Sequence, residues 1–153
     1  MINRSVILSA LVKESSTDPF VLSDSLDRIE ETKLNTVELF FPFDKLPEMK
    51  SVIKDHGIKN WVYPIAGVQK MNDLNLCDLN ERKRINAVYV ILRAIEVAEE
   101  IGAKRVLITT GRDTEKELRS KALQQFIKSM DRILSSSKGV DIMLETGDRD
   151  VDA

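Results

Sequence analysis

Residues 94–110 read AIEVAEEIGAKRVLITT, and this stretch decides the fold that the sequence predicts. Its first half continues a helical pattern that begins at Asn80 and places apolar side chains on one face up to Ile101. Gly102 ends the pattern, because glycine readily adopts the left-handed backbone conformation that closes a helix. The apolar run from Arg105 to Thr110 follows almost at once and predicts a buried strand. A helix that leads directly into a short apolar strand is the repeating step of a parallel α/β sheet.

The same alternation extends in both directions along the chain. Strands are predicted over residues 6–12, 36–41, 60–66, 105–110 and 140–145. Helices are predicted over residues 24–34, 46–56, 80–101 and 114–134. A long loop joins the third strand to the third helix, from Gly67 to about Leu79, and loops of that length are uncommon unless functional or partly helical. The sequence therefore predicts an α/β fold of about five strands and four helices in a single domain over residues 1–153.

Length and composition limit the classes of function. The chain has 153 residues, of which 42% are apolar and 31% charged, an ordinary globular composition. The net charge of −2 gives no basic surplus of the kind that nucleic-acid binders carry. No apolar run approaches the ~20 residues of a membrane span, and the N-terminal run is too short for a signal peptide. We therefore expect a cytoplasmic protein with neither a nucleic-acid nor a membrane partner, and the lone Cys77 excludes an intrachain disulfide.

Two parallel architectures fit this order of elements, and the sequence favours the barrel. A doubly wound open sheet often carries a glycine-rich phosphate loop after its first strand, but residues 13–18 contain no glycine. By the two-residue period of a strand, Glu38 and Glu145 lie on the face opposite the aliphatic one. In a barrel the aliphatic face meets the helices and the other face points to the interior. A complete eightfold barrel needs ~250 residues, so we expect parallel (β/α) units of an incomplete TIM-type barrel.

Four segments resemble the sugar phosphate isomerase/epimerase family, which has the xylose isomerase-like TIM barrel. They are residues 34–40 (LNTVELF), the helix-to-strand run 94–106, the strand end 109–111 (TTG) and residues 140–145 (VDIMLE). Each motif alone is only moderately specific for the family. The order and spacing of all four together are more specific. The resemblance covers nearly the whole chain and identifies it as the N-terminal portion of such a barrel.

The resemblance implies a divalent metal, Mn²⁺, Mg²⁺ or similar, held by a fifth-strand glutamate and by an acid, a histidine and a second acid from later strands. Glu145 matches the first of these positions, so we expect it to be both a metal ligand and a catalytic residue. Hard oxygen ligands such as its carboxylate suit these ions. The later strands are absent from the sequence, so we expect a single carboxylate to hold no metal tightly in this chain.

Three further residues are candidates for substrate binding. Glu38 lies in the second strand and is expected either to bind a substrate hydroxyl at the barrel mouth or to form a structural ion pair. Trp61 is expected either to form a wall against the sugar or to pack in the core. Arg149 follows the fifth strand, where it could meet a phosphate or carboxylate. His56, the only histidine, is expected to interact with free carbonyls at a helix end.

Three hypotheses of function remain open on the sequence alone. The first is a metal-dependent isomerase or epimerase of a small sugar or sugar derivative, of which this chain holds only part of the site and is inactive alone. The second is a non-catalytic half-barrel, a truncated product that forms homo-oligomers through its open side. The third and weakest is an endonuclease IV-like enzyme, which the lack of further histidines and of basic surplus disfavours.

Overall fold

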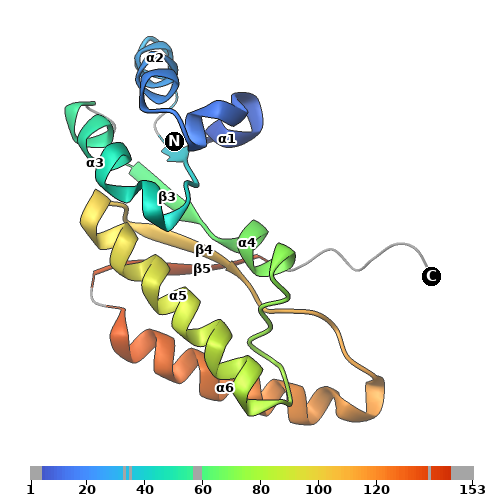
Figure 1. The fold of residues 1–153 in the computed structure, drawn as a ribbon. Coiled ribbons are helices and arrows are strands. Elements are labelled where there is room, and N and C mark those ends of the chain that lie inside the picture. Colours follow the sequence, from blue (N-terminus) through green and yellow to red (C-terminus); the bar gives the residue numbers. More distant parts are fainter. Residues whose placement is uncertain (1–4, 33, 35, 57–59, 138, 146–153) are drawn as a thin grey trace.

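Five parallel strands form one sheet, in the order β1-β2-β3-β4-β5, in the computed structural model of the chain (Figure 1). The structure describes residues 5–32, 34, 36–56, 60–137 and 139–145. The strands are β1 (Ser5–Ile7), β2 (Thr36–Glu38), β3 (Asn60–Pro64), β4 (Arg105–Thr109) and β5 (Asp141–Glu145). Each strand pairs in parallel with the next one in the sequence. The predicted class, parallel (β/α) units of a partial TIM-type barrel, is confirmed.

Four long helices connect the strands and contact one another in chain order on one side of the sheet (Figure 1). They are α2 (Pro19–Glu30), α3 (Leu46–Asp55), α5 (Glu81–Ile101) and α6 (Arg119–Ser136). The described residues also form the short helices α1 (Leu8–Leu11) and α4 (Ala66–Met71) and the 3₁₀ turns η1 (Lys13–Ser16), η2 (Phe43–Lys45) and η3 (Lys116–Leu118). Among the described residues, no helix is long and apolar enough to cross a membrane.

The N-terminal region differs from the prediction in two respects. The expected strand over residues 6–12 ends at Ile7, and Leu8–Leu11 form a helical turn instead. A short apolar run does not distinguish a buried strand from a buried helical turn, which explains this error. The first long helix begins at Pro19 and not at residue 24, because Asp18 caps it by accepting hydrogen bonds from the backbone N–H groups of Phe20 and Val21, at 2.8 and 3.3 Å.

The central helix, α5, has the boundaries that the sequence predicts. Asn80 caps its first turn by accepting a hydrogen bond from the Lys83 backbone N–H at 3.2 Å. Gly102 ends it with a φ of 75°, the left-handed conformation that favours glycine. The helix contacts α3, α6, β3 and β4. Its buried face, which forms the centre of the core, comprises Arg84, Ala87, Val88, Ile91, Ala94, Ile95, Val97, Ala98 and Ile101.

The position of α5 in the core predicts the effect of a truncation at Ile91, which has no solvent exposure. Ile91→Ala should lower the free energy of unfolding by about 3 kcal/mol, because it removes buried methyl groups and leaves a cavity. Met71→Ala is the matched control: Met71 is 77% exposed, so its truncation should change stability by less than about 0.5 kcal/mol. Urea denaturation measures both, and equal losses in the two variants would contradict the central role of α5.

Candidate functional site

The two faces of the sheet carry different residue types. Paired residues on neighbouring strands share a face, and successive residues along a strand alternate between faces. Val37 pairs with Trp61, and both belong to the main core. Glu38 therefore points away from that core. Glu145 pairs with Thr109 and follows Leu144, whose partner Ile108 is a core residue, so Glu145 shares the face of Glu38.

Glu38 and Glu145 end β2 and β5, at the carboxyl edge of a parallel sheet. The strands β3 and β4 lie between them. The pKa of Glu38 is raised, first by burial of its carboxyl group and second by the negative charge of Glu145. The charge of Glu145 acts across the two strands that lie between, so the two carboxylates lie close enough on this shared face for their charges to interact. Barrel enzymes place their chemistry at this edge of the sheet.

The strand register explains how the two ends reach the same level. Glu38 pairs with Val62, Val62 with Arg105, and Arg105 with Asp141, which is the first residue of β5. In a barrel the strands tilt by roughly 35–45° to the axis, so each successive partner is displaced along that axis. Across three pairings this displacement brings the far end of β5, where Glu145 lies, toward the level of Glu38.

Trp61 does not join these carboxylates. Its side chain is 4% exposed and lies in the main core, on the helix side of the sheet. The placement fits the packing role, which is one of the two roles that the sequence left open for Trp61. Arg149, the other predicted substrate-binding residue, lies outside the described residues, so its role stays a prediction.

His56 lies far from the carboxylates in the fold, between the helices α2 and α3. Its Nδ1 is 2.7 Å from the Val52 carbonyl oxygen in the last turn of α3. Its Nε2 is 3.3 Å from the Asp27 carboxylate on α2. The contact with the Val52 carbonyl is the one that the sequence suggested, and the link to Asp27 on α2 is an addition that the structure reveals.

Gln69 is a residue of this edge that the sequence did not indicate. It lies on α4, within the predicted loop, and is 1% exposed. Its side-chain amide accepts a hydrogen bond from the Thr109 backbone N–H at 2.8 Å and donates one to the Thr109 carbonyl oxygen at 3.1 Å. Because Thr109 is the register partner of Glu145, these bonds fix the end of β4 beside the glutamate. A glutamine in a polar loop carries no signal of such a role, which only the tertiary structure creates.

Cys77 lies in the segment that follows α4 and is half-buried. Its thiol donates a hydrogen bond to the Thr110 carbonyl oxygen at 3.1 Å, and burial raises its pKa. A thiol with a raised pKa is a poor nucleophile at neutral pH, because only the thiolate reacts. Cys77 therefore attaches this segment to the end of β4 and adds no chemistry to the site.

The site offers only some of the ligands that a metal ion needs. In the part of the chain that the structure describes, no group of three or more His, Cys, Asp or Glu side chains could hold a metal ion. Glu38 and Glu145 offer two carboxylates on one face, which suits a hard divalent cation in donor type but is too few ligands for tight binding.

A parallel (β/α) sheet with two carboxylates on one face of its carboxyl edge defines the class as a partial TIM-type barrel. The family model for xylose isomerase-like TIM barrels matches residues 26–152, and the chain therefore belongs to that family. Among proteins of curated function, none matches the sequence.

Several solved structures share the fold, all at low sequence identity. A D-tagatose 3-epimerase-like protein is 22% identical over 78% of this chain, with a TM-score of 0.65. D-psicose 3-epimerase from Clostridium cellulolyticum H10 is 12% identical over 97% of the chain, with a TM-score of 0.71. A xylose isomerase-like TIM barrel protein from Mycobacterium smegmatis, solved with magnesium, is 14% identical over 88%, with a TM-score of 0.54. The chain spans about half the length of these proteins, 47%, 53% and 49% respectively.

The interaction of the two carboxylates predicts a change in pKa on substitution of either partner. Glu145→Gln should lower the pKa of Glu38 towards its ordinary value of 4.5 without reaching it, because burial, the larger cause, remains. A carboxyl group whose pKa is raised in the folded state makes the free energy of unfolding fall as the pH rises through that pKa. Because the pKa of Glu38 is raised less in the variant, the free energy of unfolding should fall less over this pH range than in the wild-type chain. NMR titration of the Glu38 side-chain carboxyl measures the pKa. The matched control is Asp141→Asn at the other end of β5, and an equal shift in this control would disprove a local coupling.

The hydrogen bonds of Gln69 predict a local loss of order. Gln69→Leu should lower the free energy of unfolding by roughly 2 kcal/mol, because it leaves the partly buried N–H and carbonyl of Thr109 without these partners. Hydrogen exchange of the Thr109 amide should become faster. Asn72→Leu is the control, since Asn72 is exposed and loses one surface hydrogen bond, to the Val68 carbonyl. Unchanged exchange at Thr109 in the Gln69 variant would show that the amide does not hold the end of β4.

Proposed function

We propose that the chain carries part of the active site of a divalent-metal-dependent isomerase or epimerase that acts on a small sugar or sugar derivative. The observation that carries the proposal is the pair of carboxylates, Glu38 and Glu145, that share one face at the carboxyl edge of the sheet. Membership of the xylose isomerase-like family supports it, as do the sugar epimerases among the solved structures with this fold.

Glu145 is the residue that we assign to the metal. It ends a strand and is exposed at the open inner side, so its oxygens are accessible to a cation such as Mn²⁺ or Mg²⁺. In the family pattern, the remaining ligands come from strands that follow the fifth. When bound, such an ion polarises the carbonyl and the hydroxyl of the substrate. Glu145 then has a second task, which is to take up or return the proton of the neighbouring carbon atom.

Glu38 is assigned to the substrate. Burial and the charge of Glu145 raise its pKa, so Glu38 takes up a proton at a higher pH than an ordinary glutamate. A protonated carboxyl can donate a hydrogen bond to a substrate oxygen, whereas a carboxylate only accepts one. Among the described residues, no Lys, Arg or His side chain forms an ion pair with Glu38.

The position of the histidine weighs against an endonuclease IV-like enzyme. Such a site draws on histidines in this half of the barrel, but His56 is held between α2 and α3 by Val52 and Asp27. The net charge of −2 supplies no basic surplus for a nucleic-acid backbone.

Binding of Mn²⁺ tests the proposal, with electron paramagnetic resonance as the measurement of free ion. The wild-type chain should bind with a dissociation constant on the order of 1 mM, the range of sites with few protein ligands. Glu145→Gln should weaken binding about tenfold, the scale on which an altered metal site loses affinity. Asp141→Asn removes the same charge from the same strand and should leave binding unchanged. Equal effects of the two variants would mean that the ion is attracted by charge alone, and would reject Glu145 as a ligand.

A further inference from the structure

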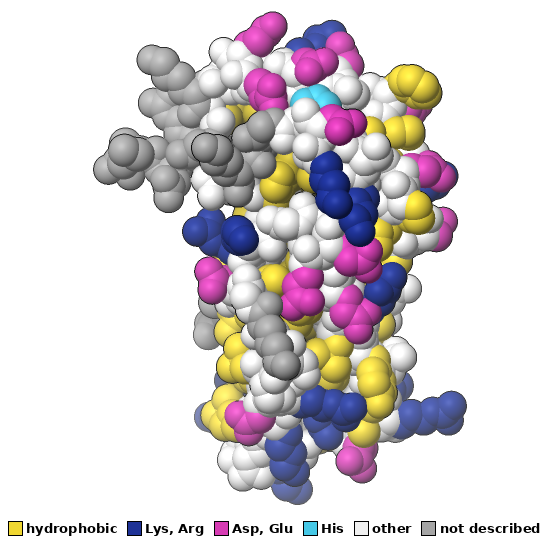
Figure 2. Space-filling model, turned by 90° about the vertical axis from the view of Figure 1, so that its left-hand side faces the viewer, with side chains coloured by type: hydrophobic (Ala, Val, Ile, Leu, Met, Phe, Trp, Pro, Cys, Tyr) yellow, Lys and Arg dark blue, Asp and Glu magenta, His cyan; other side chains and the backbone are white. Residues whose placement is uncertain are grey.

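Arg84 is a charged side chain on the buried face of α5. It is 8% exposed, whereas Figure 2 shows lysine and arginine side chains in their usual place at the surface. Its Nη2 is 3.9 Å from the carboxylate of Glu81, whose side chain is 80% exposed, so solvent weakens this ion pair. Among the described residues, its Nε has no hydrogen-bond partner. Because a buried charge with so little compensation lowers stability, packing alone does not account for an arginine at this position.

The guanidinium of Arg84 bonds to Ser129, which lies on α6 and has no solvent exposure. Arg84 Nη1 donates this hydrogen bond to Ser129 Oγ at 3.3 Å. The Ser129 hydroxyl has one proton to donate, and two carbonyl oxygens lie within its reach, that of Leu76 at 2.8 Å and that of Gln125 at 3.0 Å. Leu76 belongs to the segment between α4 and α5, so Ser129 joins both long helices to that segment.

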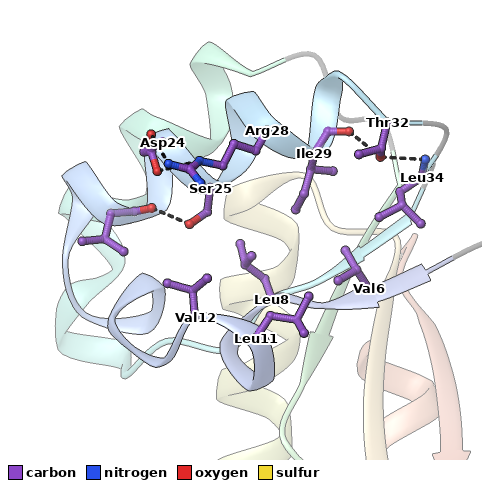
Figure 3. A pocket seen from close by; sticks show the side chains of 11 residues that line it. Val6, Leu8, Leu11, Val12, Asp24, Ser25, Arg28, Ile29, Thr32 and Leu34 are labelled. Atoms are coloured by element: carbon purple, nitrogen blue, oxygen red, sulfur yellow. Dashed lines mark hydrogen bonds and ion pairs between the residues drawn. The ribbon is translucent and has the colours of Figure 1, made fainter.

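A second buried serine shows which of these contacts is unusual. Ser25 lies on α2, is 6% exposed and donates a hydrogen bond to the Val21 carbonyl oxygen at 2.7 Å (Figure 3). Such a bond to the carbonyl four residues earlier is the common local bond of a helical serine, and the contact of Ser129 with Gln125 is of the same type. The contact with Leu76 joins residues 53 positions apart in the chain. It is therefore a product of the tertiary structure and not of helix geometry.

The segment after α4 is attached in turn to the carboxyl end of β4, by two of its side chains. The Cys77 thiol donates a hydrogen bond to the Thr110 carbonyl oxygen at 3.1 Å. The Asn75 side chain accepts a hydrogen bond from the Cys77 backbone N–H at 2.8 Å and lies directly against Gly111. A β-carbon on Gly111 would collide with the Asn75 Oδ1, and its φ of 117° favours glycine in addition. The end of β4 and this segment thus fit together as one unit.

We propose that Ser129 and Arg84 are positioning residues, which fix the segment after α4 against the end of β4 and thereby set the place of Glu145. The last step runs through the ladder between β4 and β5, in which Thr109 is the register partner of Glu145. A shift of the strand end beside Glu145 moves its carboxylate as well. The inference rests on the function proposed for Glu145, because the place of a carboxylate matters to a reaction only if that carboxylate takes part in it.

Alkylation of Cys77 by iodoacetamide tests the first step. Cys77 is the only thiol of the chain, so its reaction reports how often the segment leaves the end of β4. Ser129→Ala removes the hydroxyl that binds the buried Leu76 carbonyl and should raise the rate about tenfold, the scale of losing such a bond. The matched control is Ser25→Ala, which loses a local helix bond at a buried serine and should change the rate less than about twofold.

The ¹³C chemical shift of the Glu145 side-chain carboxyl tests the transmission to the site. It should change in Ser129→Ala and stay the same in Ser25→Ala, whereas a role confined to packing of the helices would lower stability without moving this signal. Arg84→Met removes the charge from a side chain of similar length. It should cause a smaller change than Ser129→Ala, because the Ser129 hydroxyl keeps its bond to Leu76. Urea denaturation measures the global stability of each variant, and the faster alkylation in Ser129→Ala should exceed what its loss of global stability explains.

Two results would overturn the proposal. One is an alkylation rate in Ser129→Ala no higher than in Ser25→Ala, and the other is an unchanged Glu145 signal despite faster alkylation. Neither readout uses a metal ion. A wild-type chain that binds no Mn²⁺ would therefore contradict the proposed function, while these two measurements would still decide whether Ser129 and Arg84 position the end of β4.

Discussion

The burial of α5 against the sheet is the interaction on which the rest of the structure depends. This helix contacts β3 and β4 on one side and α3 and α6 on its flanks. The face of the sheet that receives it must be apolar, because a charged group there would lose its hydration without a partner. Since residues alternate along a strand, this requirement confines Glu38 and Glu145 to the opposite face. The packing of one helix thus determines on which side of the sheet the chemistry can lie.

The carboxyl edge of the sheet has a second constraint, which comes from the point where β3 ends. The ladder between β3 and β4 continues one residue past Pro64, where the Ile65 backbone N–H donates to the Leu107 carbonyl oxygen at 2.8 Å, and it stops there because Ile65 leads into α4. The chain turns into α4, and the Gln69 amide takes over the backbone hydrogen bonds of Thr109 that a longer β3 would have made. A side chain therefore replaces the last step of the ladder, and the end of β4 stays ordered beside β5.

The sequence predicted the order of elements, the position of α5 and the face of Glu38 and Glu145, because periodicity and helix signals are local properties. It did not predict α1, since Leu8–Leu11 fits a strand or a helical turn equally well. It left open the role of Trp61, which depends on the register with Val37. Gln69 could not be found at all, because its partner is 40 residues away along the chain.

The two carboxylates and the open sheet are linked through solvent. In the described part of the chain Glu145 is exposed, so water screens much of its repulsion with Glu38. A cover over the inner side of the sheet would exclude that water. Two ionised carboxylates would then raise the free energy of the folded state unless a proton or a cation lay between them. The same loss of water strengthens the attraction of both groups for a cation. In the proposed metal site, closure of the inner side and binding of a divalent ion would therefore favour each other.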